Sequence, residues 1–181
     1  MAYFADLSDY TYHAAFYRPA TKNVGWLERG HDFEQMIPTD KILDLLWCHC
    51  QISVAQTRGI HECDLCLPPK TVFAARNGIR LLLGTSEIRV FSKEGRIYAA
   101  STLVYHHVHT HRYKPPDEFL RALGEGPIPP SKEYFELLKN AGLEWHGTGS
   151  PPVDRPAFKF EKVEGEMRRI EVRKPIYLDE S

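Results

Sequence analysis

The segment from residue 71 to residue 100 constrains the fold most, because short apolar stretches there are separated by two turn signals. Asn77-Gly78 favours a two-residue hairpin turn, and Lys93-Glu94-Gly95 marks a second turn. The stretches around these turns have the length and composition of strands, and they are 72–75, 79–83, 87–91 and 96–99. We therefore expect a β-meander, in which consecutive strands pair antiparallel.

Apolar residues at helical spacing predict helices that would cover this sheet. Thr39 and Asp40 precede such a pattern, so we expect a helix over 40–51 with Thr39 as its N-cap. The same criteria predict two short helices, at 117–123 and at 131–141, the second capped by Ser131. The sequence thus predicts an α+β fold, with a mostly antiparallel sheet and three or four helices.

The segment 101–112 fits two structures. Leu103, Val104 and Val108 recur at helical spacing behind Ser101, which suits the N-cap of a helix. Tyr and His residues also alternate from residue 105 to residue 113, as they would in a strand. We favour the helix, because Ser101 supplies a start signal and a Pro-Pro pair follows the segment.

Both ends of the chain contain further strand-like stretches, at 10–17, 23–27, 157–163 and 167–172. The first two have the aromatic composition of edge strands. Residues 147–156, GTGSPPVDRP, are rich in Gly and Pro and predict a linker. The expected organisation is one α+β domain at 1–146, a linker at 147–156 and a C-terminal β-hairpin or arm at 157–181.

Charge and hydropathy limit the classes of partner. The chain has 181 residues, with 23 Lys and Arg against 24 Asp and Glu, and a pI near 6.8. No overall positive field therefore attracts nucleic acid or an anionic membrane. The sequence has no apolar stretch of about 18 to 20 residues and does not begin like a signal peptide. We expect a cytoplasmic domain that binds neither membrane nor nucleic acid.

Four cysteines fall between residues 48 and 66, and two histidines lie among them. In a cytosolic chain such clustering indicates metal binding or catalysis more often than disulfides. Cys63 and Cys66 have the C-x2-C spacing with which a tight knuckle directs two thiolates at one ion. The sequence therefore predicts a structural zinc knuckle at this pair.

A structural zinc site takes four ligands, so two more are needed. Cys48 and Cys50 are two residues apart on the expected helix and face opposite ways, and Cys50 is the one on the apolar face. His61 is the first choice for the fourth ligand, with His106 or His111 as substitutes. The predicted ligand set is Cys50, His61, Cys63 and Cys66.

Two other interpretations of these cysteines stay open. Free cysteines are often buried as small apolar side chains without any ligand role. A redox dithiol also uses C-x2-C spacing, but it usually sits at the start of a helix. Pro68-Pro69 disfavours a helix immediately after Cys66, and so disfavours the dithiol.

The second group of metal-binding residue types is the histidine-rich run 106–111, HHVHTH. On a helix His107 and His111 are i, i+4 neighbours, the geometry with which zinc proteases bind their metal. The catalytic Glu that should follow the first histidine is missing, because position 108 is Val. The simpler interpretation is a set of hydrogen-bonded or solvated histidines. The chain also lacks a P-loop, a G-x-G-x-x-G motif and a G-x-S-x-G elbow.

Several segments together resemble an uncharacterised family of small bacterial proteins, known only as a domain of unknown function. They are YFADLSDYTY at 3–12, NVGWLERGHDF at 23–33, QTRGIHECDLC at 56–66, LGTSEIRV at 83–90 and YAASTLVYHHVHTHRYKPPDEF at 98–119. The resemblance covers roughly residues 1 to 125. Its most specific piece is T-R-G-x-H-x-C-x-x-C, on Thr57, Arg58, Gly59, His61, Cys63 and Cys66. The resemblance assigns no reaction and implies, by analogy alone, an accessory or immunity protein.

The function expected from these features is protein–protein interaction by a small cytosolic bacterial protein with a structural zinc. The absence of a complete catalytic set favours it, as does the charged C-terminal arm after the linker. The alternative is a zinc-dependent hydrolase with three protein ligands and an open position for water. A zinc-dependent nucleic-acid binder is a third, weaker hypothesis.

Overall fold

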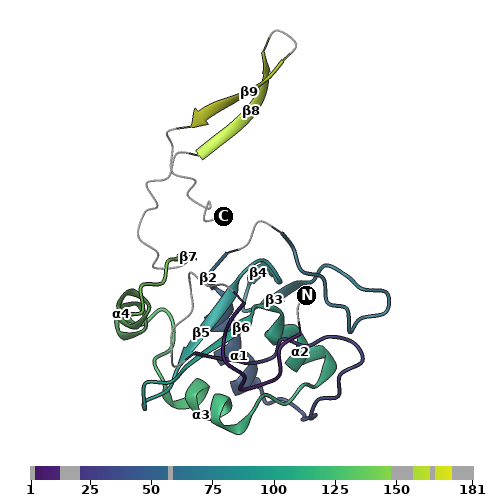
Figure 1. The fold of residues 1–181 in the computed structure, drawn as a ribbon, viewed down its shortest axis with the longest axis vertical. Helices are drawn as coiled ribbons and strands as arrows, with labels where there is room; N and C mark the ends of the chain where they lie inside the picture. Colours follow the sequence, from purple (N-terminus) through teal and green to yellow (C-terminus); the bar gives the residue numbers. More distant parts are fainter. Residues whose placement is uncertain (1–2, 13–20, 57–58, 148–156, 164–165, 173–181) are drawn as a thin grey trace. The chain divides into compact units, whose positions relative to one another are not determined.

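The chain divides into two units, Met1–Gly149 and Ser150–Ser181, in the computed structural model shown in Figure 1. The structure describes residues 3–12, 21–56, 59–147, 157–163 and 166–172. In the larger unit, five strands form one sheet in the order β1-β6-β5-β2-β7. The strands are β1 (Thr21–Asn23), β2 (Ile52–Val54), β5 (Glu87–Phe91), β6 (Ile97–Ser101) and β7 (Trp145–Gly147). All neighbours pair antiparallel except β1 and β6, which are parallel.

The predicted meander is two separate hairpins rather than one sheet. Asn77-Gly78 joins β3 (Phe73–Arg76) to β4 (Ile79–Leu82), and these two strands form a sheet of their own. The chain leaves β4 through Gly84, which has a φ of +84° and whose carbonyl accepts a hydrogen bond from His61 N–H. This contact diverts the chain between β4 and β5, so the expectation of continuous pairing was wrong.

The described residues form four helices, which are α1 (Asp40–Cys50), α2 (Leu103–His111), α3 (Asp117–Glu125) and α4 (Lys132–Asn140). Thr39 and Ser131 cap α1 and α4 as predicted, each accepting a hydrogen bond from a backbone N–H three residues later. The predicted α+β class is therefore confirmed.

Segment 101–112 is helical from Leu103, which decides between the two expected structures. Its N-cap is Thr102 instead of Ser101, because Ser101 is the last residue of β6. Ser101 still helps the start of α2, since its hydroxyl accepts a hydrogen bond from Leu103 N–H. Val104 and Val108 are fully buried on the inner face of the helix.

The expected strand over 23–27 is shorter and earlier, as only Asn23 belongs to β1. At Gly25 the φ is +69°, and a Cβ there would lie 2.9 Å from Val104 Cγ2. The chain therefore crosses close over α2 and cannot continue along the sheet. The other expected edge strand was 10–17. Its residues 10–12 are not in a strand, and residues 13–17 lie outside the described part of the chain.

Side chains of β5 alternate between two cores. Ile88 and Val90 pack in the main core with residues of α1, α2 and α3, while Phe91 packs with Tyr134 of α4 on the other face. The main core also contains Cys63. The segment that follows β2 is thus fixed against α2, which is where the candidate site lies.

In the smaller unit, β8 (Ala157–Val163) and β9 (Glu166–Val172) form an antiparallel hairpin. Gly147, the first residue of the expected linker, ends β7 and pairs with Ile52, and residues 148–156 lie outside the described part of the chain. Among the described residues, no helix has the length and apolar character needed to cross a membrane.

Candidate metal centre

The C-x2-C segment forms a tight knuckle. Cys63 pairs with Lys70 through two backbone hydrogen bonds, of 2.9 Å from Cys63 N to Lys70 O and 3.3 Å in return. The backbone N–H groups of Leu65 and Cys66 point at the Cys63 sulfur. N–H donors of this kind stabilise a thiolate, so the loop is prepared to present Cys63 as a metal ligand.

Arg29 holds the knuckle from outside. Its guanidinium donates to the carbonyl oxygens of Asp64 and Cys66, the second at 3.0 Å, and its backbone N–H donates to the Asp64 carboxylate at 3.3 Å. These three bonds fix the conformation of the loop between the two cysteines. The local sequence gives no signal for this contact, because Arg29 and Asp64 are 35 residues apart.

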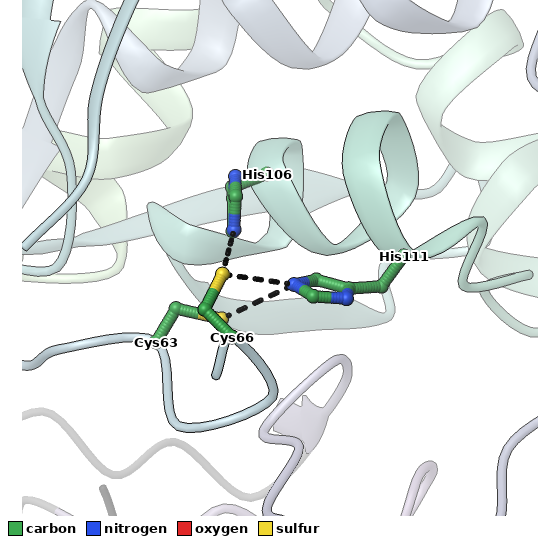
Figure 2. A group of neighbouring side chains, drawn as sticks. All are labelled: Cys63, Cys66, His106 and His111. Atoms are coloured by element: carbon green, nitrogen blue, oxygen red, sulfur yellow. Dashed lines mark hydrogen bonds between the residues drawn. The ribbon is translucent and has the colours of Figure 1, made fainter. Parts of the chain in front are cut away.

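Two histidines of α2 face the knuckle, as Figure 2 shows. Cys66 Sγ lies 3.3 Å from His106 Nε2 and 3.4 Å from His111 Nε2, and Cys63 Sγ lies 3.5 Å from His111 Nε2. All four ligand atoms fall within 4.8 Å of one another. Cys63, Cys66 and His106 are buried, and His111 is partly buried.

The three short sulfur–nitrogen distances fit a tetrahedral ion. With Zn–S bonds of about 2.3 Å and Zn–N bonds of about 2.0 Å, tetrahedral ligand atoms are separated by roughly 3.3 to 3.8 Å. The three sulfur–nitrogen distances given above lie inside this interval. The group of Cys63, Cys66, His106 and His111 could therefore hold a metal ion.

The C-terminal turn of α2 explains why His106 and His111, five residues apart, lie at one centre. On a regular helix His106 and His111 would be about 140° apart around the axis. The helix ends at His111, and Arg112 takes a left-handed conformation with a φ of 59°. Its N–H donates to the carbonyl of His107, five residues back, which widens the last turn and brings His111 toward His106. The two rings meet at a centroid distance of 5.0 Å.

The protonation states suit ligation by neutral imidazole. Burial, together with the nearby His111 and Lys70, lowers the pKa of His106 to about 4. Burial also lowers the pKa of His111. Both rings are therefore uncharged near neutral pH. Burial raises the pKa of Cys63 to about 11, against the N–H donors from Cys66 and Leu65, so a cation is the partner its thiolate needs.

Thr110 orients one of the two imidazoles. Its Oγ1 lies 3.1 Å from Nδ1 of His106, while Nε2 of the same ring faces Cys66. If the hydroxyl accepts from Nδ1–H, the free lone pair sits on Nε2 and points into the centre. In that tautomer the ring can bind a metal through Nε2.

The structure brings together only two of the four residues predicted from the sequence, Cys63 and Cys66. Cys50 is buried as expected for the apolar face of α1, but its sulfur lies 3.7 Å from the carbonyl of Thr102 and outside the group. His61 Nε2 lies 3.1 Å from the hydroxyl of Tyr12. The two histidines that replace them are the substitutes named from the sequence.

Other residues of the sequence motifs take different places. His107 is buried, and its Nδ1 lies 3.2 Å from the carbonyl of Gly25, in keeping with the simpler interpretation of a hydrogen-bonded histidine, and it does not belong to the group that contains His111. Cys48 is partly exposed. Thr57 and Arg58 of the T-R-G-x-H-x-C-x-x-C motif lie outside the described residues.

Comparison with known proteins assigns the chain to a family. A family model described as a domain of unknown function, DUF7919, matches residues 2–124, which is more than half of the chain. The chain belongs to the DUF7919 family. This confirms the resemblance to an uncharacterised family inferred from the sequence. No curated protein and no solved structure matches the chain.

The DUF7919 match includes both halves of the candidate centre, the knuckle and the two histidines of α2. It ends within α3, so α4, β7 and the β8–β9 hairpin lie beyond it. The part of the chain that defines the family is therefore the part that contains the centre.

Proposed function

We propose that Cys63, Cys66, His106 and His111 bind one structural zinc ion. The observation that carries this proposal is the convergence of four ligand atoms, from two segments far apart in sequence, within 4.8 Å. Two thiolates and two imidazoles in tetrahedral geometry are a donor set that zinc prefers. Three of the four ligands are buried, which suits an ion held for stability.

A four-ligand centre supports the structural role over the hydrolytic one. A catalytic zinc needs an open position for water, and so has three protein ligands. Here a fourth protein ligand occupies that position. No further observation in the described residues favours the hydrolase, and we propose no reaction for this centre.

The zinc would join the knuckle to α2. Apparent binding energies of structural zinc reach about 10 kcal/mol or more, which is comparable with the total stability of about 5 to 15 kcal/mol typical of a domain. Loss of the ion would leave two buried thiols, the buried imidazole of His106 and the partly buried imidazole of His111 facing one another. The knuckle should then unfold, and α2 should lose its packing against it.

The function that this closed, stabilised domain supports best is interaction with a protein partner. We propose a small cytosolic bacterial protein of the accessory or immunity type. Support comes from the four-ligand centre, from the lack of a complete catalytic motif in the sequence, and from the charged C-terminal segment. The near-neutral pI counts against nucleic acid as the partner.

The test combines metal content with melting. Full-length protein purified without chelator should contain about one zinc per chain, and chelation should lower its melting temperature substantially. Cys66→Ser should lose the zinc, whereas the matched variant Cys48→Ser should keep it. Absence of zinc, or a metal-free form that melts like the loaded one and gains hydrolytic activity with metal, would contradict the proposal.

A further inference from the structure

A groove runs between the β3–β4 hairpin and α2, beside the metal centre. One wall is the continuous segment 70–76, and the other is one face of α2 formed by Tyr105, His106, His109 and Thr110. The groove has a volume of about 600 Å³. His106 belongs both to this wall and to the metal centre, so the centre fixes the position of one side of the groove.

The first wall is the unpaired edge of a strand. Among the described residues β3 pairs with β4 alone. Arg76 and Ile79 flank the two-residue turn and form a hydrogen-bonded pair, so by the alternation of an antiparallel ladder Ala74 also bonds to β4. The N–H and C=O groups of Phe73 and Ala75 then point to the opposite edge.

An unpaired strand edge that lines a groove beside a helix is suited to an extended polypeptide. The main chain of such a peptide can exchange hydrogen bonds with Phe73 and Ala75, while its alternate side chains enter the groove. Exposed edges of this kind otherwise invite unwanted pairing, and proteins usually cover or charge them. No described strand other than β4 pairs with β3.

Charge indicates the chemistry of the peptide. Lys70, at one end of the groove, takes part in none of the ion pairs of the described residues. Arg76, at the other end, is paired with Asp44 at 2.6 Å and Asp40 at 3.2 Å. His109 is exposed and stacked on Tyr105. An acidic side chain would find its free partner at Lys70.

We propose that the edge of β3 binds an extended acidic segment of a partner protein, which adds to the hairpin as a third strand against α2. The inference rests on the proposed interaction function and identifies the edge of β3 as the surface that contacts the partner. The peptide backbone pairs with Phe73 and Ala75, and a carboxylate near one end of the segment pairs with Lys70. The two-stranded sheet becomes three-stranded when the partner is bound.

The test uses a random twelve-residue peptide library displayed on phage, selected against the zinc-loaded full-length protein. Enriched peptides should contain acidic residues within an alternating extended pattern. Ala75→Pro removes an outward N–H without removing a bond to β4, and should weaken a selected synthetic peptide by about tenfold or more. The matched control is Arg80→Pro, whose N–H faces the far edge of the hairpin, and it should bind within about threefold of the wild type.

A second measurement needs no protein variant. Two versions of the selected peptide are compared, one with its odd-numbered and one with its even-numbered backbone nitrogens methylated. Only one edge of an added strand pairs with β3, so one version should lose binding and the other should bind nearly as well as the unmodified peptide. Lys70→Glu should weaken acidic peptides selectively.

Failure to enrich any peptide, or binding that survives Ala75→Pro and both methylation patterns, would overturn this inference. A dimer formed through β3 would overturn it as well, by making a second copy the occupant. Zinc content and melting temperature are measured on the same samples. A zinc-loaded, stable protein that binds no peptide would therefore refute the groove while leaving the zinc proposal intact.

Discussion

Thr110→Val tests whether the hydroxyl that faces His106 supports metal binding. Valine has nearly the shape of threonine, so the change removes the 3.1 Å contact between Oγ1 and Nδ1 and leaves both ligating nitrogens in place. A hydrogen bond of this kind contributes about 1 kcal/mol net, and loss of such outer partners weakens metal affinity by about 10- to 100-fold. We expect zinc affinity to fall at least about tenfold, which corresponds to about 1.4 kcal/mol.

The assay is competition for zinc with a chromophoric chelator at pH 7.5, with melting of the same samples at limiting zinc. A loss of about 1.4 kcal/mol should lower the melting temperature by roughly 3 to 6 °C in a protein of this size. The control is Thr71→Val, which removes a hydroxyl that donates to Glu62 at 3.3 Å instead of facing a histidine ligand. Equal zinc affinity in wild type and Thr110→Val would refute the role given to this hydroxyl.

Three other predictions concern stability and metal release. Burial lowers the pKa of His49 to about 4, so the free energy of unfolding should fall by up to about 3 kcal/mol as the pH drops from about 6.5 toward 4. If His49→Phe loses stability with falling pH as steeply as the wild type, this prediction is wrong. Gly84→Ala should destabilise far more than Gly78→Ala in urea unfolding, because both glycines have positive φ but only at Gly84 would a Cβ collide with the carbonyl of His61. Arg29→Ala should speed zinc release measured by chelator trapping, because the knuckle loses its external hydrogen bonds, and an unchanged rate would exclude that role.

The fold was largely predictable because its elements carry local signals. Caps at Thr39 and Ser131, and the turn at Asn77-Gly78, depend on residues within three or four positions of one another. The division of the meander was not predictable in this way. It depends on Gly84 meeting His61, a contact between segments more than twenty residues apart.

Half of the candidate centre was predictable for the same reason. The C-x2-C spacing of Cys63 and Cys66 is a local feature of a knuckle. His106 and His111 were named from the sequence only as substitutes for His61, because a regular helix places i, i+4 residues on one face and so pairs His111 with His107. The left-handed residue Arg112 changes that geometry and selects His106 instead. Cys50 met the burial criterion for a ligand, but burial at a core position does not specify what the sulfur faces.

X-ray absorption at the zinc edge of the purified full-length protein tests the central claim most directly. Ligation by Cys63, Cys66, His106 and His111 requires two sulfur atoms at about 2.3 Å and two nitrogen atoms at about 2.0 to 2.1 Å. The set with Cys50 and His61 would instead show three sulfurs and one nitrogen, and an open hydrolytic site would show a bound oxygen in place of a protein ligand. We predict two sulfurs and two imidazole nitrogens with no oxygen. A spectrum with three sulfurs, or with an oxygen ligand, would contradict the closed centre described above.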